Sequence, residues 1–190
     1  MTFNTDAALE WAWLVFLGYW VIAGLRVNRM ARREPGASLI VRILLMVGAY
    51  WLLFRQDPLF GVLNRRFLPY DPRLELAGVI VTWAGVAFAI WARFHLGRFW
   101  SASVSLREQH QLIRSGPYAY VRHPIYNGIL TMFLGTTLAV GRYRALIAFL
   151  VVLAAFVVKS RHEEKLLEAQ FGPAFEEHRR HTGFFLPRLS

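Results

Sequence analysis

The sequence predicts an all-α fold, a bundle of membrane-spanning helices in a single domain. Hydrophobic residues make up 56% of the 190-residue chain, more than a soluble domain needs, because its surface must also face water. These residues fall in long apolar blocks separated by short polar segments. Arginines flank the blocks, as they do beside the spans of polytopic membrane proteins.

Each apolar block is long enough to cross or nearly cross a bilayer, which gives about five spans. The blocks comprise residues 9–25, 38–54, 74–94, 125–140 and 143–158.

The third block carries small residues that suit close helix packing in lipid, namely Gly78, Ala84, Gly85, Ala87 and Ala89. Only Gly141-Arg142 separates the last two blocks, which predicts a tight C-terminal helical hairpin. The final helix is expected to continue as an amphipathic helix through Lys165. A Phe171-Gly172-Pro173 break then leads into a basic tail.

The formal charge of +10 comes almost entirely from arginine. Nucleic-acid binding is not expected, because these arginines lie between apolar blocks rather than on one face. Under the positive-inside rule, the basic segment 26–33 and the C-terminus lie in the cytoplasm and the N-terminus lies outside. The arginines of the 55–73 loop run against this orientation. We expect a multi-pass protein of a bacterial inner membrane.

The chain has no cysteine, which excludes disulfides, thiol catalysis and thiolate metal sites. No histidine and carboxylate spacing indicates a metal centre either, so none is expected.

Polar and aromatic residues gather in the stretch HQLIRSGPYAYVRHPIYNG, residues 110–128. Gly116-Pro117 predicts a turn, and Pro124 suits the first position of a helix, where its missing N–H costs nothing. His123 is thereby placed at the mouth of a span, where free N–H groups can meet an anionic partner. The alternative is an interfacial aromatic belt with an Arg-His pair for lipid headgroups.

A second polar stretch, KSRHEEKLLE, covers residues 159–168 at the inner end of the last span. Lys159 and Glu163 are four positions apart and share one helix face. The alternative here is a solvated helix end with ordinary ion pairs.

Together the two stretches resemble the isoprenylcysteine carboxyl methyltransferases and the related phospholipid N-methyltransferases. Three motifs carry the resemblance, Gly116-Pro117-Tyr118, Arg122-His123-Pro124 followed by Tyr126 and Gly128, and Glu163-Glu164 before Phe171-Gly172. The match extends over residues 110–180. It implies a membrane methyltransferase in which residues 1–94 supply the first three spans and residues 95–190 the cytosolic cofactor pocket and catalytic part.

The resemblance also implies a cofactor, S-adenosylmethionine, which leaves as S-adenosylhomocysteine. The cofactor-binding residues would be His110, Gln111, Leu112, Ile113, Gly116, Tyr118, His123, Pro124, Ile125, Tyr126 and Glu163. Lys159 and Glu164 would be catalytic, with Lys159 standing where the carboxyl methyltransferases hold the substrate carboxylate with arginine. The segment 95–113, with Phe99 and Trp100, is expected to close over the cofactor.

The expected acceptor is a lipid-like or prenylated molecule, with carboxylate O-methylation favoured over phospholipid N-methylation. The sequence departs from the family at Lys159, at Phe175 and His178, where tyrosines are usual, and at His181-Thr182-Gly183. The sequence therefore does not determine which molecule accepts the methyl group, nor the oligomeric state of the protein. Two other classes remain as alternatives, an NADPH-dependent membrane reductase and a non-catalytic membrane protein.

Overall fold

The computed structural model describes residues 4–25, 36–55, 58–97 and 112–188. Within these ranges the chain is helical and contains no β-strand, which confirms the all-α prediction. The elements are α1 (Thr5–Leu25), α2 (Gly36–Phe54), the 3-10 helix η1 (Pro58–Asn64), α3 (Pro72–Leu96), the 3-10 helix η3 (Gly116–Ala119), α4 (Pro124–Val140), α5 (Tyr143–Phe171) and α6 (Pro173–His181).

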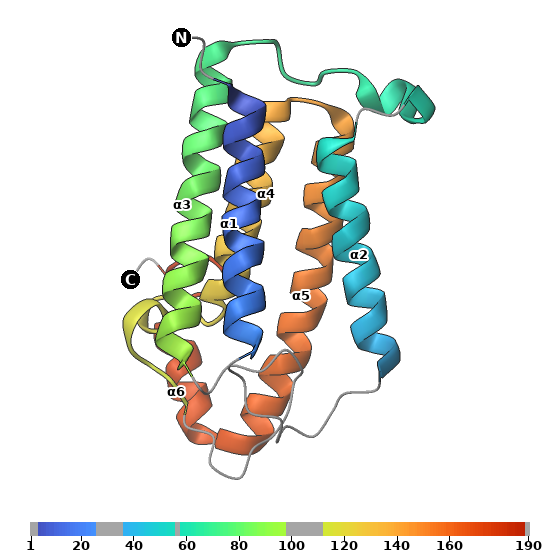
Figure 1. Cartoon of the computed structure of the whole chain (residues 1–190). Helices are drawn as coiled ribbons and strands as arrows, with labels where there is room; N and C mark the ends of the chain where they lie inside the picture. Colours follow the sequence, from blue (N-terminus) through green and yellow to red (C-terminus); the bar gives the residue numbers. More distant parts are fainter. Residues whose placement is uncertain (1–3, 26–35, 56–57, 98–111, 189–190) are drawn as a thin grey trace.

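The long helices α1 to α5 run side by side in one bundle, as Figure 1 shows. Helix α3 packs along α4 and also contacts α1, while α5 contacts both α2 and α4. The starts of α1 and α3 lie at one end of the bundle with the α4–α5 turn (Figure 1). The opposite end, here called the α6 end, holds α6 and the start of α4.

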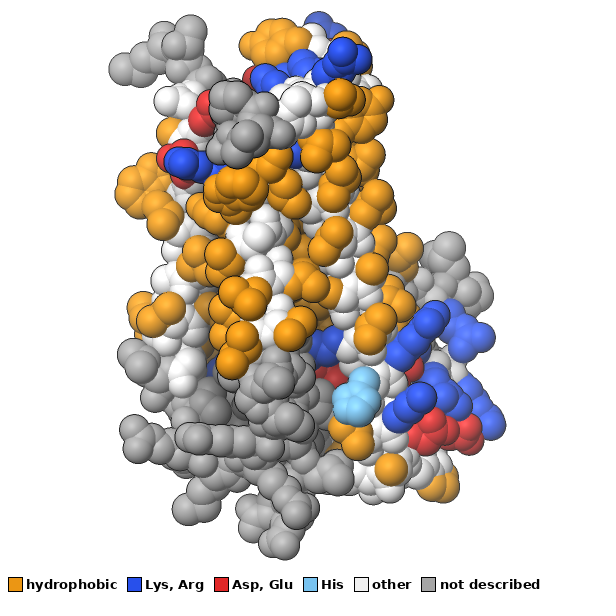
Figure 2. Space-filling view, turned by 90° about the vertical axis from the view of Figure 1, so that its right-hand side faces the viewer, with side chains coloured by type: hydrophobic (Ala, Val, Ile, Leu, Met, Phe, Trp, Pro, Cys, Tyr) orange, Lys and Arg blue, Asp and Glu red, His pale blue; other side chains and the backbone are white. Residues whose placement is uncertain are grey.

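Three of the described helices are long and apolar enough to cross a membrane, α1 over Thr5–Gly24, α3 and α5. The apolar helices Ile43–Phe54 and Pro124–Val140 are shorter, so the count of five spans stays a prediction. On the face drawn in Figure 2, apolar side chains cover the middle of the bundle, and charged side chains gather towards its two ends. This banding is the pattern that a bilayer selects.

Helices α3 and α4 approach each other through glycines. A Cβ atom on Gly78 would lie 2.5 Å from the carbonyl oxygen of Gly135, and a Cβ on Gly128 would lie 2.7 Å from the Cβ of Ala89. The two backbones are therefore in direct contact, the geometry that small residues allow in membrane interfaces. The predicted packing role is confirmed for Gly78, Gly85 and Ala89, which are buried. It is wrong for Ala84 and Ala87, which are exposed.

The bundle interior holds a few polar side chains, and two of them join different helices. The indole N–H of Trp13 in α1 donates to Thr136 Oγ1 of α4 at 3.1 Å. Arg144, near the start of α5, is 2% exposed and donates to the carbonyls of Leu52 and Leu53. These two carbonyls belong to the last turn of α2, where no intrahelical donor is available. Arg144 therefore ties the end of α2 to the start of α5.

The C-terminal part agrees with the predicted hairpin but is more helical than predicted. Gly141 adopts a left-handed φ of 63° in the tight turn between α4 and α5. Helix α5 continues to Phe171 rather than to about Lys165, and Gly172 ends it. The following residues, predicted as a basic tail, form α6 instead. Pro173 starts this helix at a position where a proline needs no N–H partner.

Candidate active site

A tight turn at Gly116 and a helix start at Pro124 bring residues 112–128 of the polar stretch to the start of α4. Gly116 has a φ of +58°, and a Cβ on it would lie 2.7 Å from the His95 ring at the end of α3. The turn therefore needs glycine both for its backbone and for its close approach to His95. Pro124 occupies the first turn of α4, with His123 as the residue just before it. The predicted turn and the predicted helix start are both confirmed.

The imidazole of His123 bridges two adjacent carboxylates from α5. Its Nδ1 lies 3.6 Å from Glu163 Oε2, and its Nε2 lies 3.2 Å from Glu164 Oε1. A neutral imidazole carries one N–H, whereas both nitrogens here face a carboxylate. Burial lowers the pKa of His123, but the hydrogen bonds to the two glutamates outweigh burial and raise the pKa above its ordinary value. The arrangement favours the doubly protonated imidazolium.

Glu163 also contacts Tyr126 and Lys159. Tyr126 donates from its hydroxyl to Glu163 Oε1 at 2.6 Å, and Lys159 Nζ lies 3.7 Å from the same oxygen. The Lys159 ammonium also lies over the Tyr126 ring, 5.0 Å from its centroid. Glu163 keeps 21% of its side-chain surface exposed and Lys159 keeps 17%. Both charged groups can therefore still meet a ligand.

Aromatic rings surround the charged groups. The Tyr126 ring stacks on Phe156 at 4.7 Å and on His123 at 5.7 Å. Ser160 lies on the same face of α5 between Phe156 and Glu163, and its buried hydroxyl has no hydrogen-bond partner in the described part of the chain. The site thus combines carboxylates, π faces and a free hydroxyl at the polar end of two apolar helices.

Arg122 connects this cluster to the C-terminal segment. Its Nε donates to Glu164 Oε1 at 2.6 Å, and its Nη1 donates to the carbonyls of Arg179 and Thr182. Charge-assisted bonds of this length are the strong class of hydrogen bond. Arg122 and His123 therefore hold the same oxygen of Glu164, Oε1.

Residues 182–185, here called the C-terminal strap, form one wall of the site. Gly183 accepts a backbone hydrogen bond from Arg122 and donates one to Tyr120, and Phe184 packs edge-on against His123 with a centroid distance of 5.1 Å. Asn127 Nδ2 donates to the Phe185 carbonyl at 2.7 Å. The sequence reasoning missed this wall. The only available signal was the pair of aromatic residues after the basic segment.

Tyr118 links the site to the end of α3. It is 8% exposed, and burial together with the charge of Glu163 raises the pKa of its hydroxyl, against the lowering influence of Arg93. Its ring stacks with that of His95 at 6.5 Å. Tyr118 is therefore a neutral hydrogen-bonding group at any physiological pH.

The structure brings most of the predicted site residues to the α6 end of the bundle. His123, Tyr126, Lys159, Glu163 and Glu164 form one connected set of contacts, as the distances above show. Pro124 and Ile125 are buried in the first turn of α4, and Gly116 and Tyr118 form the preceding turn. Leu112 and Ile113 are half-buried just before that turn.

The remaining predicted site residues, His110 and Gln111, lie outside the described residues, as do Phe99 and Trp100. Their assignment stays a prediction. Within the described ranges no group of three or more metal-binding side chains is present.

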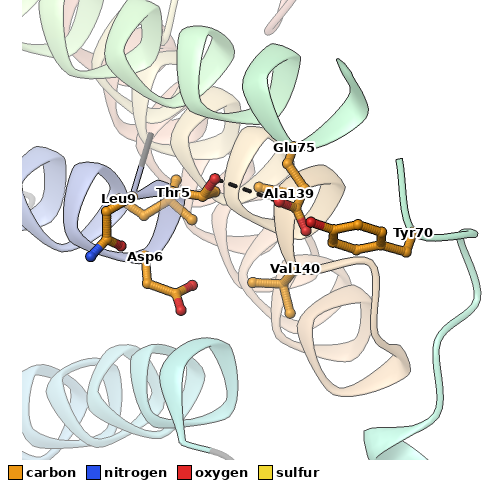
Figure 3. A pocket seen from close by; sticks show the side chains of 8 residues that line it. Thr5, Asp6, Leu9, Tyr70, Glu75, Ala139 and Val140 are labelled. Atoms are coloured by element: carbon orange, nitrogen blue, oxygen red, sulfur yellow. Dashed lines mark hydrogen bonds between the residues drawn. The ribbon is translucent and has the colours of Figure 1, made fainter. Parts of the chain in front are cut away.

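A cavity of about 450 Å³ lies elsewhere, at the opposite end of the bundle. Thr5, Asp6 and Leu9 of α1, Glu75 of α3, and Ala139 and Val140 of α4 line it, together with Asn4 and Tyr70. Figure 3 shows the Thr5 hydroxyl facing Glu75, to which it donates at 3.5 Å. None of the predicted site residues lines this cavity, so its location does not bear on the cluster around Glu163.

The family model that matches the chain is described as phospholipid methyltransferase, and it covers residues 74–174. This range is more than half of the chain and contains α4 and α5, nearly all of α3, and the whole His123–Glu163 cluster. The chain belongs to the phospholipid methyltransferase family.

Two of the curated relatives that match the chain carry different kinds of name. A protein-S-isoprenylcysteine O-methyltransferase of Schizosaccharomyces pombe is 35% identical over 83 residues, which are 43% of this chain and 35% of the relative. The cobalt-zinc-cadmium resistance protein CzcN of Cupriavidus metallidurans is 40% identical over 101 residues, 50% of this chain and 44% of the relative. The chain thus spans about half, or less, of the length of these relatives.

A solved structure shares the fold. The eukaryotic intramembrane Ras methyltransferase ICMT, an isoprenylcysteine carboxyl methyltransferase, superposes with a TM-score of 0.63 at 18% identity. The superposition covers 94% of this phospholipid methyltransferase family member and 62% of the ICMT chain. The helical arrangement described above is therefore an intramembrane fold that a known methyltransferase also uses.

Proposed function

We propose that this protein is an S-adenosylmethionine-dependent methyltransferase that acts on a lipid-like or prenylated acceptor, with a carboxylate as the favoured methyl acceptor. One observation carries the proposal. Glu163, His123, Tyr126 and Lys159 form one connected cluster at the polar end of two apolar helices. The family match and the shared fold support the same activity.

The chemistry of the cluster fits the cofactor. S-adenosylmethionine carries an ammonium group and a sulfonium group, both cationic. Glu163 offers a partly exposed carboxylate for the ammonium, and the stacked rings of Tyr126 and Phe156 offer π faces that attract cations. The free N–H groups at the start of α4 suit the cofactor carboxylate. Gly116, Tyr118, Pro124 and Ile125 would shape the pocket around these groups, with His110, Gln111, Leu112 and Ile113 as its further wall.

When bound, the cofactor would supply an electrophilic methyl group whose transfer breaks the carbon–sulfur bond and leaves the bonding electrons on sulfur. A carboxylate oxygen is already a nucleophile at neutral pH, so no proton has to be removed. The chain's residues would then act by positioning the reactants and excluding water. Opposite charges disappear as the ester forms, which a dry site at the membrane edge favours.

Lys159 would orient the acceptor carboxylate. Its ammonium lies on the same side of the cluster as the Tyr126 ring, within reach of Glu163. Lysine offers a single point charge rather than the two-pronged grip of arginine. A looser hold on the carboxylate suits an acceptor other than the one that an arginine at this position selects.

An amine acceptor, as in phospholipid N-methylation, would need a proton acceptor. Glu164 is the candidate, because it is hydrogen-bonded to His123 and half-buried. This second function is favoured by the description of the family model. For either acceptor, the distribution of arginines supports a site on the cytoplasmic face of a bacterial inner membrane, with the N-terminus outside.

The experiment is a binding titration of the protein purified in detergent, with S-adenosylmethionine and NADPH in parallel. The native protein should bind S-adenosylmethionine, and the Glu163→Gln and His123→Ala variants should lose this binding. Binding of NADPH alone would favour a reductase, and unchanged affinity in both variants would refute the placement of the cofactor. Transfer of radiolabelled methyl groups into a total membrane extract then identifies the acceptor.

A further inference from the structure

Main-chain and side-chain hydrogen bonds attach the C-terminal strap to the residues just before α4. Its backbone pairs with the segment before α4 in a short parallel bridge between Val121 and Gly183. Arg122 N donates to the Gly183 carbonyl at 2.9 Å, and Gly183 N donates to the Tyr120 carbonyl at 3.0 Å. The strap therefore holds the residues immediately before His123 by their main chain.

A chain of side-chain contacts runs from the strap to Glu163. The Thr182 carbonyl accepts from Arg122, Arg122 donates to Glu164, and Glu164 pairs with His123. The other nitrogen of His123 then faces Glu163. Each group in this series is at most half exposed, so the bonds act in a medium where they are stronger than in water.

Phe184 adds an apolar contact to the same series. Its ring lies edge-on to His123 at 5.1 Å, and the Arg122 guanidinium lies 5.7 Å from its centroid. One aromatic side chain thus contacts both cations that grip Glu164. Phe185 packs on the core cluster of the bundle and anchors the far end of the strap.

The structure has no space for a side chain at Gly183. A Cβ on this residue would lie 1.6 Å from the carbonyl oxygen of Leu186, a backbone atom of the turn that follows. No rotation of a side chain can relieve such a contact. Any substitution here must displace the backbone of the strap at Gly183 or that of Leu186, which follows it.

We propose that the C-terminal strap is a working part of the ligand site, and that Arg122 and Phe184 are positioning residues which set the orientation of Glu163 through Glu164 and His123. The proposal deepens the function proposed above and rests on it for the identity of the ligand. It divides the two glutamates by role. In methyl transfer to a carboxylate, Glu163 meets the ligand, whereas Glu164 holds the imidazole in place.

The test compares Gly183→Ala with Gly48→Ala, a matched variant in α2 whose added Cβ meets nothing within 4 Å. Both proteins are purified in detergent and titrated with S-adenosylmethionine. Gly183→Ala should bind about tenfold or more weakly, while Gly48→Ala should match the native protein. Native affinity in a folded Gly183→Ala protein would overturn the proposal.

Two conservative variants of Phe184 keep the test valid if Gly183→Ala does not fold. Phe184→Leu keeps an apolar side chain but loses the π face, and Phe184→Tyr keeps the ring. Phe184→Leu should lose cofactor affinity, and Phe184→Tyr should restore it. Equal affinities of the two variants and the native protein would count against the role of the ring.

A measurement without ligand separates this inference from the proposed function. Histidine NMR signals in labelled protein report the protonation of His123 as pH is varied. Gly183→Ala should move this titration towards that of a free histidine, whether or not the protein binds S-adenosylmethionine. An unchanged His123 titration sinks the strap proposal, whereas failure of the native protein to bind the cofactor sinks the proposed function alone.

Discussion

The hydroxyl of Tyr126 donates to Glu163 Oε1 at 2.6 Å and so joins the first turn of α4 to the inner end of α5. The two residues are 37 positions apart, and no other side-chain hydroxyl in the cluster makes such a short bond to a carboxylate. Together with the contacts from His123 and Lys159, this bond fixes the direction in which the Glu163 carboxylate faces.

Replacement of Tyr126 by Phe should weaken cofactor binding while the fold is kept. A hydrogen bond to a charged group contributes about 1.5–3 kcal/mol, so the affinity for S-adenosylmethionine should fall roughly tenfold to a hundredfold. Calorimetric titration measures this loss. Tyr143→Phe is the matched control, because Tyr143 is 43% exposed at the opposite end of the bundle. Equal losses in the two variants would point to a general effect of phenol removal.

Lys159→Ala should separate binding from turnover. The ammonium lies beside Glu163 but is assigned to the acceptor, so cofactor affinity should change little and methyl transfer should fall by about two orders of magnitude, as for loss of a positioning charge. Lys159→Arg should recover part of the rate. The measurement is turnover with the labelled acceptor at saturating cofactor. Normal turnover in Lys159→Ala would remove Lys159 from acceptor binding.

The stability that His123 contributes should fade as pH rises. Its pKa is raised above the ordinary 6.5, because the bonds to Glu163 and Glu164 outweigh burial. A group of this kind stabilises the folded state fully below its unfolded pKa and loses that contribution as pH climbs through the folded pKa. The gap in thermal midpoint between the native protein and His123→Gln should therefore be largest below the ordinary pKa of 6.5 and shrink as pH rises above it.

The pKa of His178 is shifted in the opposite direction to that of His123, so the effects of the two histidines on the pH dependence of stability must be distinguished. Burial and the nearby Arg114, Arg122 and His181 lower the pKa of His178. Its contribution is present above the ordinary pKa and is lost as pH falls through the lowered one. Because both proteins in the comparison contain His178, its effect cancels in the difference. A gap that widens with increasing pH would contradict the imidazolium assignment.

Gly135→Ala should destabilise the bundle, since a Cβ there would lie 2.5 Å from the backbone nitrogen of Thr82. Overpacking of this kind costs about 1–3 kcal/mol, which should appear as a lower thermal midpoint in detergent. Gly18→Ala, in α1, adds a Cβ with nothing within 4 Å and serves as the control. A native midpoint for Gly135→Ala would mean that the two helices can separate at no cost.

Local signals in the sequence were enough to predict the five long helices and the pairing of Lys159 with Glu163. Gly116-Pro117 and Pro124 have fixed backbone preferences, and Lys159 and Glu163 are paired by helix spacing alone. The long-range contacts had no such signal. The bonds from Arg144 to the end of α2 and from Arg122 to the strap depend on how distant segments pack. Helix α6 was not predicted, because its many charged residues were interpreted as a basic tail although Pro173 suits a helix start.

The glycine contact between α3 and α4 also bears on how the proposed long-chain acceptor would reach the site. A Cβ on Gly85 would already lie 2.7 Å from the carbonyl oxygen of Gly128, so this seam is too narrow for a single methylene group. A prenyl or acyl tail could not slide in from the lipid between these two helices. The tail of the proposed acceptor would therefore have to enter along a different flank of α4 or α5.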